Sequence, residues 1–494
     1  MVTLKARLWD YGGLCHDLGI SPADPPPARP VFIDRVDVDA EYCRPNSLFV
    51  PRMPHRDEIE PPDQPVEVPA ALERGASLAL TDLPPGSFAA QAPVIYVPDR
   101  HAALLRLARA GRDRFTGRMI AITGSVGKTT TKALLHHVLA HVGPAEMSRG
   151  NYNGINGVAI TLASLSPAAR YCVTEISSAF PGSLPSKLPH LEPDVALLTT
   201  IGHSHLGNFP DRAAILRDKF HLIEALQGDG IAIFGEDVIA LDRQHDNLIA
   251  GRDLSWMSVG RASWCDVQLL EAETSLDDVR AVVRVGGRRH AVYLPVPGQA
   301  HAVAACHVLA CVHALGLDVA QAVDCLAGYA APGNQRGARW RVNVGNRGAI
   351  VEVIDDSQNA APESVAELMS YLALRRNGRK VLVMADMLEL GDHSAALHGD
   401  LLPGLIEAGV DELVAVGPFT GQLADRLQGR IAVSKHDTPL MAARHLFATL
   451  KGGELVALKG SGDWELREVL RRLSPAAHRT RAGRNWRIEH DAPT

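Results

Sequence analysis

Residues 123–130, TGSVGKTT, combine the residue types that hold the phosphates of a nucleotide. Small residues let backbone N–H groups approach an anion, a lysine can neutralise the terminal phosphate, and a threonine hydroxyl can ligate Mg²⁺. The full phosphate-loop pattern has a glycine where Ile122 stands, so a chance turn of small residues is the alternative. The predicted ATP contacts in this loop are Gly124, Ser125, Gly127, Lys128, Thr129 and Thr130.

The residues on either side of the loop predict the strand and the helix that such a site requires. Residues 119–122 are an apolar run, and apolar residues recur at helical spacing from Leu134 to Val142. A helix that begins directly after the loop turns the positive end of its dipole toward the phosphates. The position between strand and helix therefore favours a phosphate site over a chance turn.

Similar apolar runs recur along the chain and predict parallel strands that are buried on both faces. They are residues 171–173, 195–198, 231–234, 349–354, 381–384, 413–416 and 455–458. We therefore predict an α/β protein of three domains. The predicted limits are 1–116 for a mixed α/β N-terminal domain, 117–332 for a central P-loop ATPase domain with a mostly parallel sheet, and 333–494 for a Rossmann-like C-terminal domain. The Pro-rich stretches 22–30 and 61–69 are expected to be extended connectors.

Charge and composition narrow the classes of partner. The chain of 494 residues has a net charge of -6, so we expect no binding to nucleic acid or to an anionic membrane. Its seven cysteines include no C-x-x-C pair, which predicts reduced thiols, and we find neither a secretion signal nor a membrane-spanning run. We therefore expect a cytoplasmic protein that acts on small molecules, as a monomer or a homodimer.

Further motifs follow the phosphate loop in the order that is typical of one enzyme family. They are GNYN at 150–153, EISS at 175–178, TTIGHSHL at 199–206, DDSQNAAP at 355–362, DMLELG at 386–391 with His398, and KGS at 459–461. Together with TGSVGKTT they resemble the Mur ligases over about residues 117–470. The last three motifs are similar to the branch that adds D-alanyl-D-alanine to UDP-N-acetylmuramoyl-tripeptide. The resemblance implies a ligase that uses ATP to convert a carboxylate into an acyl phosphate, joins it to an amine, and releases ADP and phosphate.

The resemblance also implies which residues hold the metal ions. Lys128 and a magnesium ion on Thr129 and Glu175 would screen the repulsion between the substrate carboxylate and the γ-phosphate. A second magnesium ion is held in the family by a histidine, the same glutamate and a carbamylated lysine, which match His205, Glu175 and Lys219. The alternatives are a solvated helix lysine at Lys219 and a satisfied core histidine at His205. The implied catalytic residues are Lys128, Glu175, His205 and Lys219.

Other positions match contacts to the two substrates. Asn151, Asn153 and Ser177 are candidates for holding the carboxylate. Arg336 resembles an interdomain arginine that contacts ATP phosphates, with Arg339 as the competing assignment. Asp356 and Asn359 resemble nucleotide contacts that the last domain delivers when it closes.

The first domain departs from the family pattern. Members that bind a UDP-sugar peptide carry D-S-R before P-G-x-L-F, whereas residues 39–41 are DAE, so Glu41 replaces an arginine suited to phosphate or uridine. A D-G-H-x-F segment is also missing, and QAHAV at 299–303 replaces the H-N-x-x-N that approaches adenine. We therefore hypothesise a carboxylate substrate that lacks UDP, in specialised metabolism. The alternatives are the authentic cell-wall ligase and a nucleotide-binding scaffold without catalysis.

Overall fold

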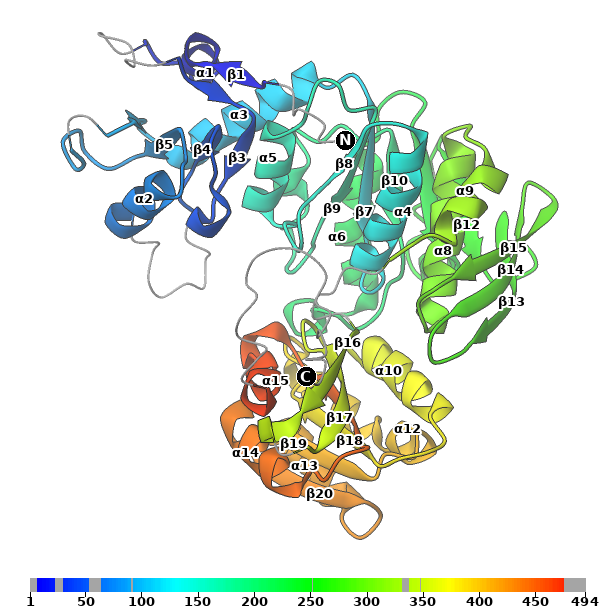
Figure 1. Ribbon diagram of the computed structural model, residues 1–494. Coiled ribbons are helices and arrows are strands. Elements are labelled where there is room, and N and C mark those ends of the chain that lie inside the picture. The colour runs from blue at the N-terminus through cyan, green and yellow to red at the C-terminus, as the bar shows by residue number, and fades with distance from the viewer. Residues whose placement is uncertain are drawn as a thin grey trace, which may run out of the picture.

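The computed structural model describes residues 7–22, 30–52, 64–89, 92–250, 252–330, 337–346 and 348–474. These residues form three α/β bodies, with the N-terminal and central ones side by side and the C-terminal one below them in the view of Figure 1. The predicted limits at residues 116 and 332 stay predictions. The first of them falls between helix α3 (Arg100–Arg114) and strand β7 (Arg118–Thr123).

The N-terminal body is built on a parallel sheet in the order β3-β4-β5-β6. Its strands are β3 (Arg35–Asp37), β4 (Ser47–Phe49), β5 (Leu78–Thr81) and β6 (Val94–Tyr96), and the other elements are β1 (Trp9–Asp10), α1 (Tyr11–Leu18), β2 (Phe32–Ile33), η1 (Ala40–Tyr42) and α2 (Gln64–Glu73). Helix α3 packs against α5 (Ile155–Ala163) of the central body, so the two bodies share one apolar core. A Cβ atom on Gly111 would lie 2.1 Å from the Leu162 carbonyl oxygen, because these helices approach so closely.

The central body contains a sheet in the order β15-β14-β13-β12-β11-β10-β7-β9-β8. The parallel strands are β7, β8 (Ala145–Met147), β9 (Tyr171–Glu175), β10 (Val195–Leu198), β11 (Ile231–Gly235), β12 (Ser255–Gly260) and β13 (Val267–Thr274), and the antiparallel ones are β14 (Val279–Val285) and β15 (Arg288–Leu294). The helices are α4 (Lys128–Val142), α5, α6 (Arg212–Glu224), α7 (Glu236–Gln244), α8 (Gln299–Ala314) and α9 (Val319–Leu326). The predicted strand–loop–helix at residues 119–142 is confirmed by β7 and α4.

The C-terminal body has a sheet in the order β16-β17-β21-β18-β19-β20, in which only β16 runs antiparallel. The strands are β16 (Ala338–Asn343), β17 (Ile350–Asp356), β18 (Lys380–Ala385), β19 (Glu412–Val416), β20 (Ala432–His436) and β21 (Leu455–Lys459). The helices are α10 (Pro362–Leu374), α11 (Ser394–Gly399), α12 (Leu402–Glu407), α13 (Pro418–Leu427), α14 (Pro439–Thr449) and α15 (Arg467–Leu473). The four strands predicted here from apolar runs are β17, β18, β19 and β21.

The two Pro-rich stretches were expected to be extended connectors. The Pro-rich stretch at 61–69 is not an extended connector throughout, because α2 begins at Gln64. Pro65 suits this helix, since the first turn needs no donor at that N–H. The stretch at 22–30 lies mostly outside the described residues.

No helix in the described part of the chain has the length and apolar character needed to cross a membrane.

Candidate active site

The loop between β7 and α4 depends on two glycines with positive φ, Gly124 at 143° and Gly127 at 85°. A Cβ atom on Gly124 would lie 2.1 Å from the hydroxyl oxygen of Thr199, just beyond the end of β10. A side chain at position 124 is therefore excluded by the backbone angle and by the neighbouring strand. The loop lies at the carboxyl edge of the central sheet, where α/β proteins bind their ligands.

The predicted phosphate contacts gather around this loop. Within the described residues the Ser125 hydroxyl is buried and has no hydrogen-bond partner. The Lys128 ammonium donates to the carbonyl oxygens of Gly124 at 2.7 Å and of Ser125 at 3.0 Å. Thr129 and Thr130 lie in the first turn of α4, where free N–H groups and the helix dipole favour an anion. An orphaned hydroxyl, a cation and a helix start together fit a polyphosphate.

Glu175, at the end of β9, is the centre of the polar contacts beside the loop. Its side chain is buried, and it accepts hydrogen bonds from the Thr129 hydroxyl at 2.8 Å and the Asn153 amide at 2.7 Å. The Lys132 ammonium lies 3.5 Å from the carboxylate. Burial raises the pKa of the Glu175 carboxyl, but the charges of Lys128 and Lys132, with the hydrogen bonds, bring it below its ordinary value. The carboxylate is therefore ionised at neutral pH.

The pair of Thr129 and Glu175 fits a magnesium ion. A hydroxyl and an ionised carboxylate are hard oxygen ligands of the kind that Mg²⁺ prefers, and they lie beside the phosphate loop. The set predicted for a second ion is arranged differently. The ring of His205 lies against the carboxylate of Glu389 from the C-terminal body, while Lys219 contacts Ser178. Among the described residues no three His, Cys, Asp or Glu side chains are placed to hold a metal ion.

Lys219 is buried in the centre of α6 rather than solvated, so the alternative of an exposed helix lysine is wrong. Its ammonium nitrogen lies 3.5 Å from the Ser178 carbonyl oxygen. Burial, and then the charge of Lys128, lower the pKa of Lys219 well below its ordinary value, although Asp218 acts in the opposite direction. Burial therefore favours the neutral amine over the ammonium form.

The GNYN segment joins the predicted carboxylate contacts to this centre. The side chain of Asn153 donates to Glu175, and its carbonyl oxygen accepts from the amide and the hydroxyl of Ser177, both at 3.0 Å. Asn151 is exposed, two residues earlier in the same loop. Lys187, which sequence analysis missed, donates to the carbonyl oxygen of Ser177 at 2.6 Å. The structure thus brings Asn153, Ser177 and Glu175 together.

The predicted nucleotide contacts of the last body lie at the carboxyl edge of its own sheet. Asp356, at the end of β17, pairs at 2.6 Å with the buried ammonium of Lys459, at the end of β21. Asn359 accepts a hydrogen bond from the following amide at 2.9 Å. Arg336 lies outside the described residues. Its competitor Arg339 pairs at 2.6 Å with Asp277 of the central body.

Direct contacts join the central and C-terminal bodies beside the phosphate loop. Glu363, in the first turn of α10, accepts from the amide of His203 at 3.0 Å and from its ring at 2.6 Å. The amide of Gly207 donates to the carbonyl oxygen of Glu389 at 2.8 Å. A Cβ atom on Gly207 would lie 2.4 Å from the amide nitrogen of Gly391, so the backbones of the two bodies touch.

The C-terminal body also covers the start of α8. This is the position where the related ligases carry the asparagines that approach adenine and where this chain has none. Glu367 of α10 accepts a hydrogen bond from the amide of Ala300 at 3.0 Å. The His301 ring bonds the carbonyl oxygen of Pro297 at 2.6 Å. Burial lowers the pKa of His301, so its ring is neutral at physiological pH. The side chains of Glu367 and His301 are a carboxylate and an imidazole, so they differ chemically from the side-chain amides of an asparagine pair.

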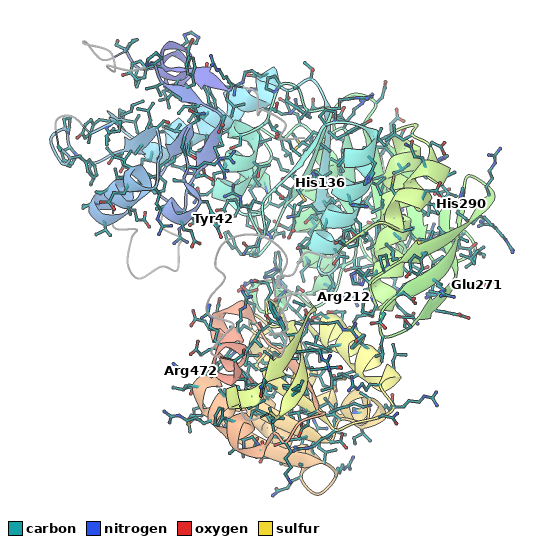
Figure 2. The ribbon with its side chains drawn as sticks, viewed as in Figure 1. Tyr42, His136, Arg212, Glu271, His290 and Arg472 are labelled. Atoms are coloured by element: carbon teal, nitrogen blue, oxygen red, sulfur yellow. The ribbon has the colours of Figure 1, made fainter. Side chains whose placement is uncertain are left out.

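A boundary between the first and central bodies carries a fixed cation. The Arg149 guanidinium lies 3.1 Å from the buried carboxylate of Asp37, and it covers the exposed ring of Tyr42 at 4.9 Å from the centroid. Tyr42 lies on the side of the first body that is nearer the C-terminal body (Figure 2). Arginine held by a buried acid and stacked on an aromatic ring presents donors in a fixed orientation.

A second cation lies close to the position where the family pattern has its arginine. Asp39 accepts from the hydroxyl of Tyr152 at 2.5 Å and lies 3.3 Å from Arg52. Glu41 follows two residues later in η1. The acidic segment at 39–41 is thus accompanied by a cation, Arg52, that lies outside the family motif.

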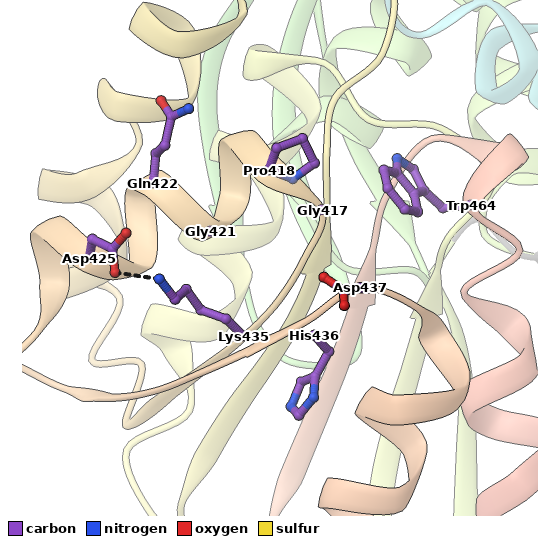
Figure 3. Close-up of a pocket in the computed structure, with 9 residues that line it drawn as sticks. All are labelled: Gly417, Pro418, Gly421, Gln422, Asp425, Lys435, His436, Asp437 and Trp464. Atoms are coloured by element: carbon purple, nitrogen blue, oxygen red, sulfur yellow. Dashed lines mark hydrogen bonds and ion pairs between the residues drawn. The ribbon is translucent and has the colours of Figure 1, made fainter.

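A cavity of about 350 Å³ opens at the carboxyl edge of the C-terminal sheet (Figure 3). Its lining includes Trp464, His436 and Asp437, and Lys435 pairs with Asp425 at 2.7 Å. Of the residues predicted for the site, none in the described part of the chain lines this cavity. It is therefore distinct from the phosphate loop.

Comparison with known proteins decides the family. The description "Mur ligase middle domain" matches residues 122–312, and "Mur ligase, glutamate ligase domain" matches residues 339–462. The chain belongs to the Mur ligase family. It is an ATP-dependent acid–amino-acid ligase, so the family and the enzyme class predicted from the motifs are confirmed.

Relatives of this Mur ligase cover most of its length. The UDP-N-acetylmuramoyl-tripeptide--D-alanyl-D-alanine ligase of Rickettsia prowazekii is 27% identical over 377 residues, 76% of this chain and 82% of the relative. MurF from Acinetobacter baumannii is 26% identical, with a TM-score of 0.75 over 94% of this chain and 98% of its own. MurF from Thermotoga maritima, solved in complex with ADP, has the same fold at 23% identity, with a TM-score of 0.70 over 89% and 96%. The predicted three-domain fold is confirmed.

Sequence analysis missed several polar residues of this Mur ligase because their partners are distant in the chain. Lys132 contacts Glu175, Lys187 contacts Ser177, and Glu363 contacts His203. Only Lys132 had a local signal, since it follows Lys128 by one helical turn and faces the same way. The others depend on tertiary packing.

Proposed function

We propose that this Mur ligase adds D-alanyl-D-alanine to UDP-N-acetylmuramoyl-tripeptide. The observation that carries the ligase chemistry is the convergence of Thr129 and Asn153 on Glu175, between the phosphate loop and the GNYN loop. The choice of substrates is supported by relatives that carry this activity in their names. Those relatives favour this alternative over the carboxylate without UDP that the sequence first suggested.

The described residues can perform the first step by holding two anions against each other. Lys128, the loop amides and the Ser125 hydroxyl would hold the β- and γ-phosphates of ATP, while Asn151 and Ser177 hold the substrate carboxylate. A carboxylate oxygen attacks the γ-phosphorus, the bond to the bridging oxygen breaks, and ADP leaves. Magnesium on Thr129 and Glu175 supplies charge neutralisation at the phosphates when it is bound.

In the second step the free amine attacks the carbonyl carbon of the acyl phosphate. The tetrahedral intermediate expels inorganic phosphate, and the nitrogen loses one proton as the amide forms. Glu363 and Glu389 contact the central body. These contacts would hold the C-terminal body closed over the acyl phosphate and exclude water from it. In this arrangement Arg336, Asp356 and Asn359 are the proposed nucleotide contacts.

A carbamate on Lys219 belongs to this proposal. Only a neutral amine adds carbon dioxide, and burial favours that form because it lowers the pKa of Lys219 well below its ordinary value. The carbamate would replace it by an anionic oxygen ligand, and His205 would join it once Glu389 moves away. Intact-protein mass spectrometry in bicarbonate should show the added mass of carbon dioxide, and Lys219→Ala should lack it.

The first body must still bind a sugar nucleotide although Glu41 replaces an arginine. Arg149 and Arg52 are two cations near the GNYN loop that can approach phosphate oxygens. The exposed ring of Tyr42 offers a surface for stacking. These residues support a UDP-bearing substrate without the D-S-R motif.

The deciding experiment measures ADP release with pairs of substrates. UDP-N-acetylmuramoyl-tripeptide and the same muramoyl-tripeptide without UDP are each offered with D-alanyl-D-alanine or with L-alanyl-L-alanine, and products are identified by mass spectrometry. We expect ADP and product only with the UDP-bearing acid and the D,D-dipeptide. Equal turnover of the acid without UDP would return the assignment to a different carboxylate, and Lys128→Met is the inactive control.

A further inference from the structure

Lys132 is a buried charge that the reaction described above does not use. It follows Lys128 by one turn of α4, and its side chain is 2% exposed. Its ammonium donates to the carbonyl oxygen of Gly150 at 2.7 Å and lies 3.5 Å from the carboxylate of Glu175. A charge buried to this extent is costly unless its partners compensate it.

Gly150 and Glu175, two partners of Lys132, belong to the two halves of the active site. Gly150 opens the loop that carries Asn151 and Asn153, while Glu175 is the carboxylate that accepts from Thr129. Thr129 and Lys132 are three residues apart in α4 and therefore face the same side of the helix. The loop in turn places Asn153 on the second oxygen of Glu175 at 2.7 Å. Helix, loop and strand thus meet at one ammonium group.

We infer that Lys132 is a positioning residue that holds the GNYN loop and serves as the resident counter-charge of Glu175 when no divalent ion is bound. This inference rests on the proposed function for the identity of the loop's substrate. The counter-charge itself follows from the contacts alone. A carboxylate with an ammonium group at 3.5 Å is stabilised as an anion before any metal ion arrives.

The two roles predict opposite effects when the charge is removed. An ammonium group beside Glu175 repels a dication that approaches the same carboxylate, so its loss should strengthen divalent-ion binding. The loop loses its anchor at the same time, so the carboxylate substrate should bind or react less well. A residue that only supported the fold would weaken both.

The first test compares Lys132→Met with Lys132→Arg by titrating the purified protein with Mn²⁺ alone, followed by electron paramagnetic resonance. We expect Lys132→Met to lower the Kd for Mn²⁺ by roughly threefold or more, because the repulsion is removed. Lys132→Arg keeps the charge and should leave that Kd within about twofold of the parent value. Weaker or unchanged Mn²⁺ binding by Lys132→Met would overturn the counter-charge role. No substrate is present, so a wrong substrate assignment cannot produce this result.

The second test measures the KM values for ATP and for UDP-N-acetylmuramoyl-tripeptide in both variants. Both replacements disturb the bond to Gly150, so we expect the KM for the carboxylate to rise about tenfold while that for ATP changes little. Lys380→Met is the matched control, because Lys380 is also buried and donates to the carbonyl oxygen of Ala408 at 2.7 Å, away from the site. Equal effects on both KM values, or the same pattern in the control, would overturn the positioning role. If Lys132→Met does not fold, Lys132→Arg alone decides this point.

Discussion

The Thr129 hydroxyl donates to Oε2 of Glu175 across 2.8 Å, which joins the first turn of α4 to the end of β9. The hydroxyl therefore lies where it can share a magnesium ion with the carboxylate. Thr129→Val keeps the shape of the side chain and removes the oxygen, and we expect kcat to fall about 100-fold. Thr129→Ser retains the hydroxyl and should keep most of the activity. ADP release at saturating ATP measures both, and equal activities of the two variants would contradict a metal-binding role.

The two glycines of the phosphate loop should respond differently to alanine. At Gly124 the added methyl group would lie 2.1 Å from the Thr199 hydroxyl, whereas at Gly127 the nearest atom would be 3.9 Å away. Gly127→Ala meets only the cost of positive φ, about 1 kcal/mol, while Gly124→Ala should cost about 3 kcal/mol or more because of the clash. Chemical denaturation measures both values. Similar losses at the two positions would contradict the close approach of β10.

The sequence predicted the strands that carry the site, and the reason is physical. Parallel strands buried on both faces are continuous apolar runs, so β7, β9, β10 and β17 were evident from composition alone. The antiparallel strand β14 was missed, although Val279, Ala281, Val283 and Val285 alternate with exposed or half-buried residues. That alternation is the usual signal of a sheet with one solvated face.

The environment of the site could not be predicted, because it depends on contacts between distant segments. Motif spacing indicated Lys219, but only the packing of α6 shows that its amine is buried and that burial lowers its pKa. His205 was expected beside Glu175, yet its ring contacts Glu389 of another body. Residues 39–41 lack the arginine of the family pattern, but Arg52 and Arg149 lie near this segment. No local sequence pattern indicates either of them.

Contact between Gly207 and Gly391 makes domain closure testable. A methyl group at position 207 would lie 2.4 Å from the amide nitrogen of Gly391, so Gly207→Ala should keep the C-terminal body from docking as described. We expect about tenfold lower kcat and a larger radius of gyration in small-angle scattering with ADP. Gly328→Ala, whose nearest contact would be 3.5 Å away, is the control. An unchanged radius with full activity would show that the contact is dispensable.

Arg149 provides a test of the sugar-nucleotide subsite. Arg149→Gln removes the cation that lies on Asp37 and on the Tyr42 ring, so the KM for UDP-N-acetylmuramoyl-tripeptide should rise about tenfold. The KM for ATP should stay near its parent value, because the phosphate loop is untouched. Arg170→Gln also removes an arginine from a tyrosine ring, that of Tyr171, and serves as the control. Equal effects of the two variants would place the UDP group elsewhere.

Lys187 should make stability depend on pH in a direction that is unusual for a lysine. Its ammonium is buried and donates to Ser177 at 2.6 Å, and burial lowers the pKa of Lys187 from 10.5 to about 8, against the charge of Asp218. Between these two values the unfolded chain binds more protons than the folded one, so raising the pH favours folding. The free energy of unfolding of the parent, relative to Lys187→Met, should therefore rise by about 1–2 kcal/mol from pH 7 to pH 9.5.

Urea denaturation at the two pH values measures this difference directly, since the other titrating groups are common to both proteins. Lys435→Met removes an exposed ammonium that pairs with Asp425 at 2.7 Å, so it relieves little burial cost and is the matched control. Below pH 8 Lys187 is charged in the folded protein, and its desolvation lowers the free energy of unfolding. Above pH 8 the amine is neutral and this cost is absent. The difference in the free energy of unfolding between the parent and Lys187→Met could instead be the same at both pH values. Lys187 would then keep its proton throughout, and Ser177 would accept from an ammonium group at every pH.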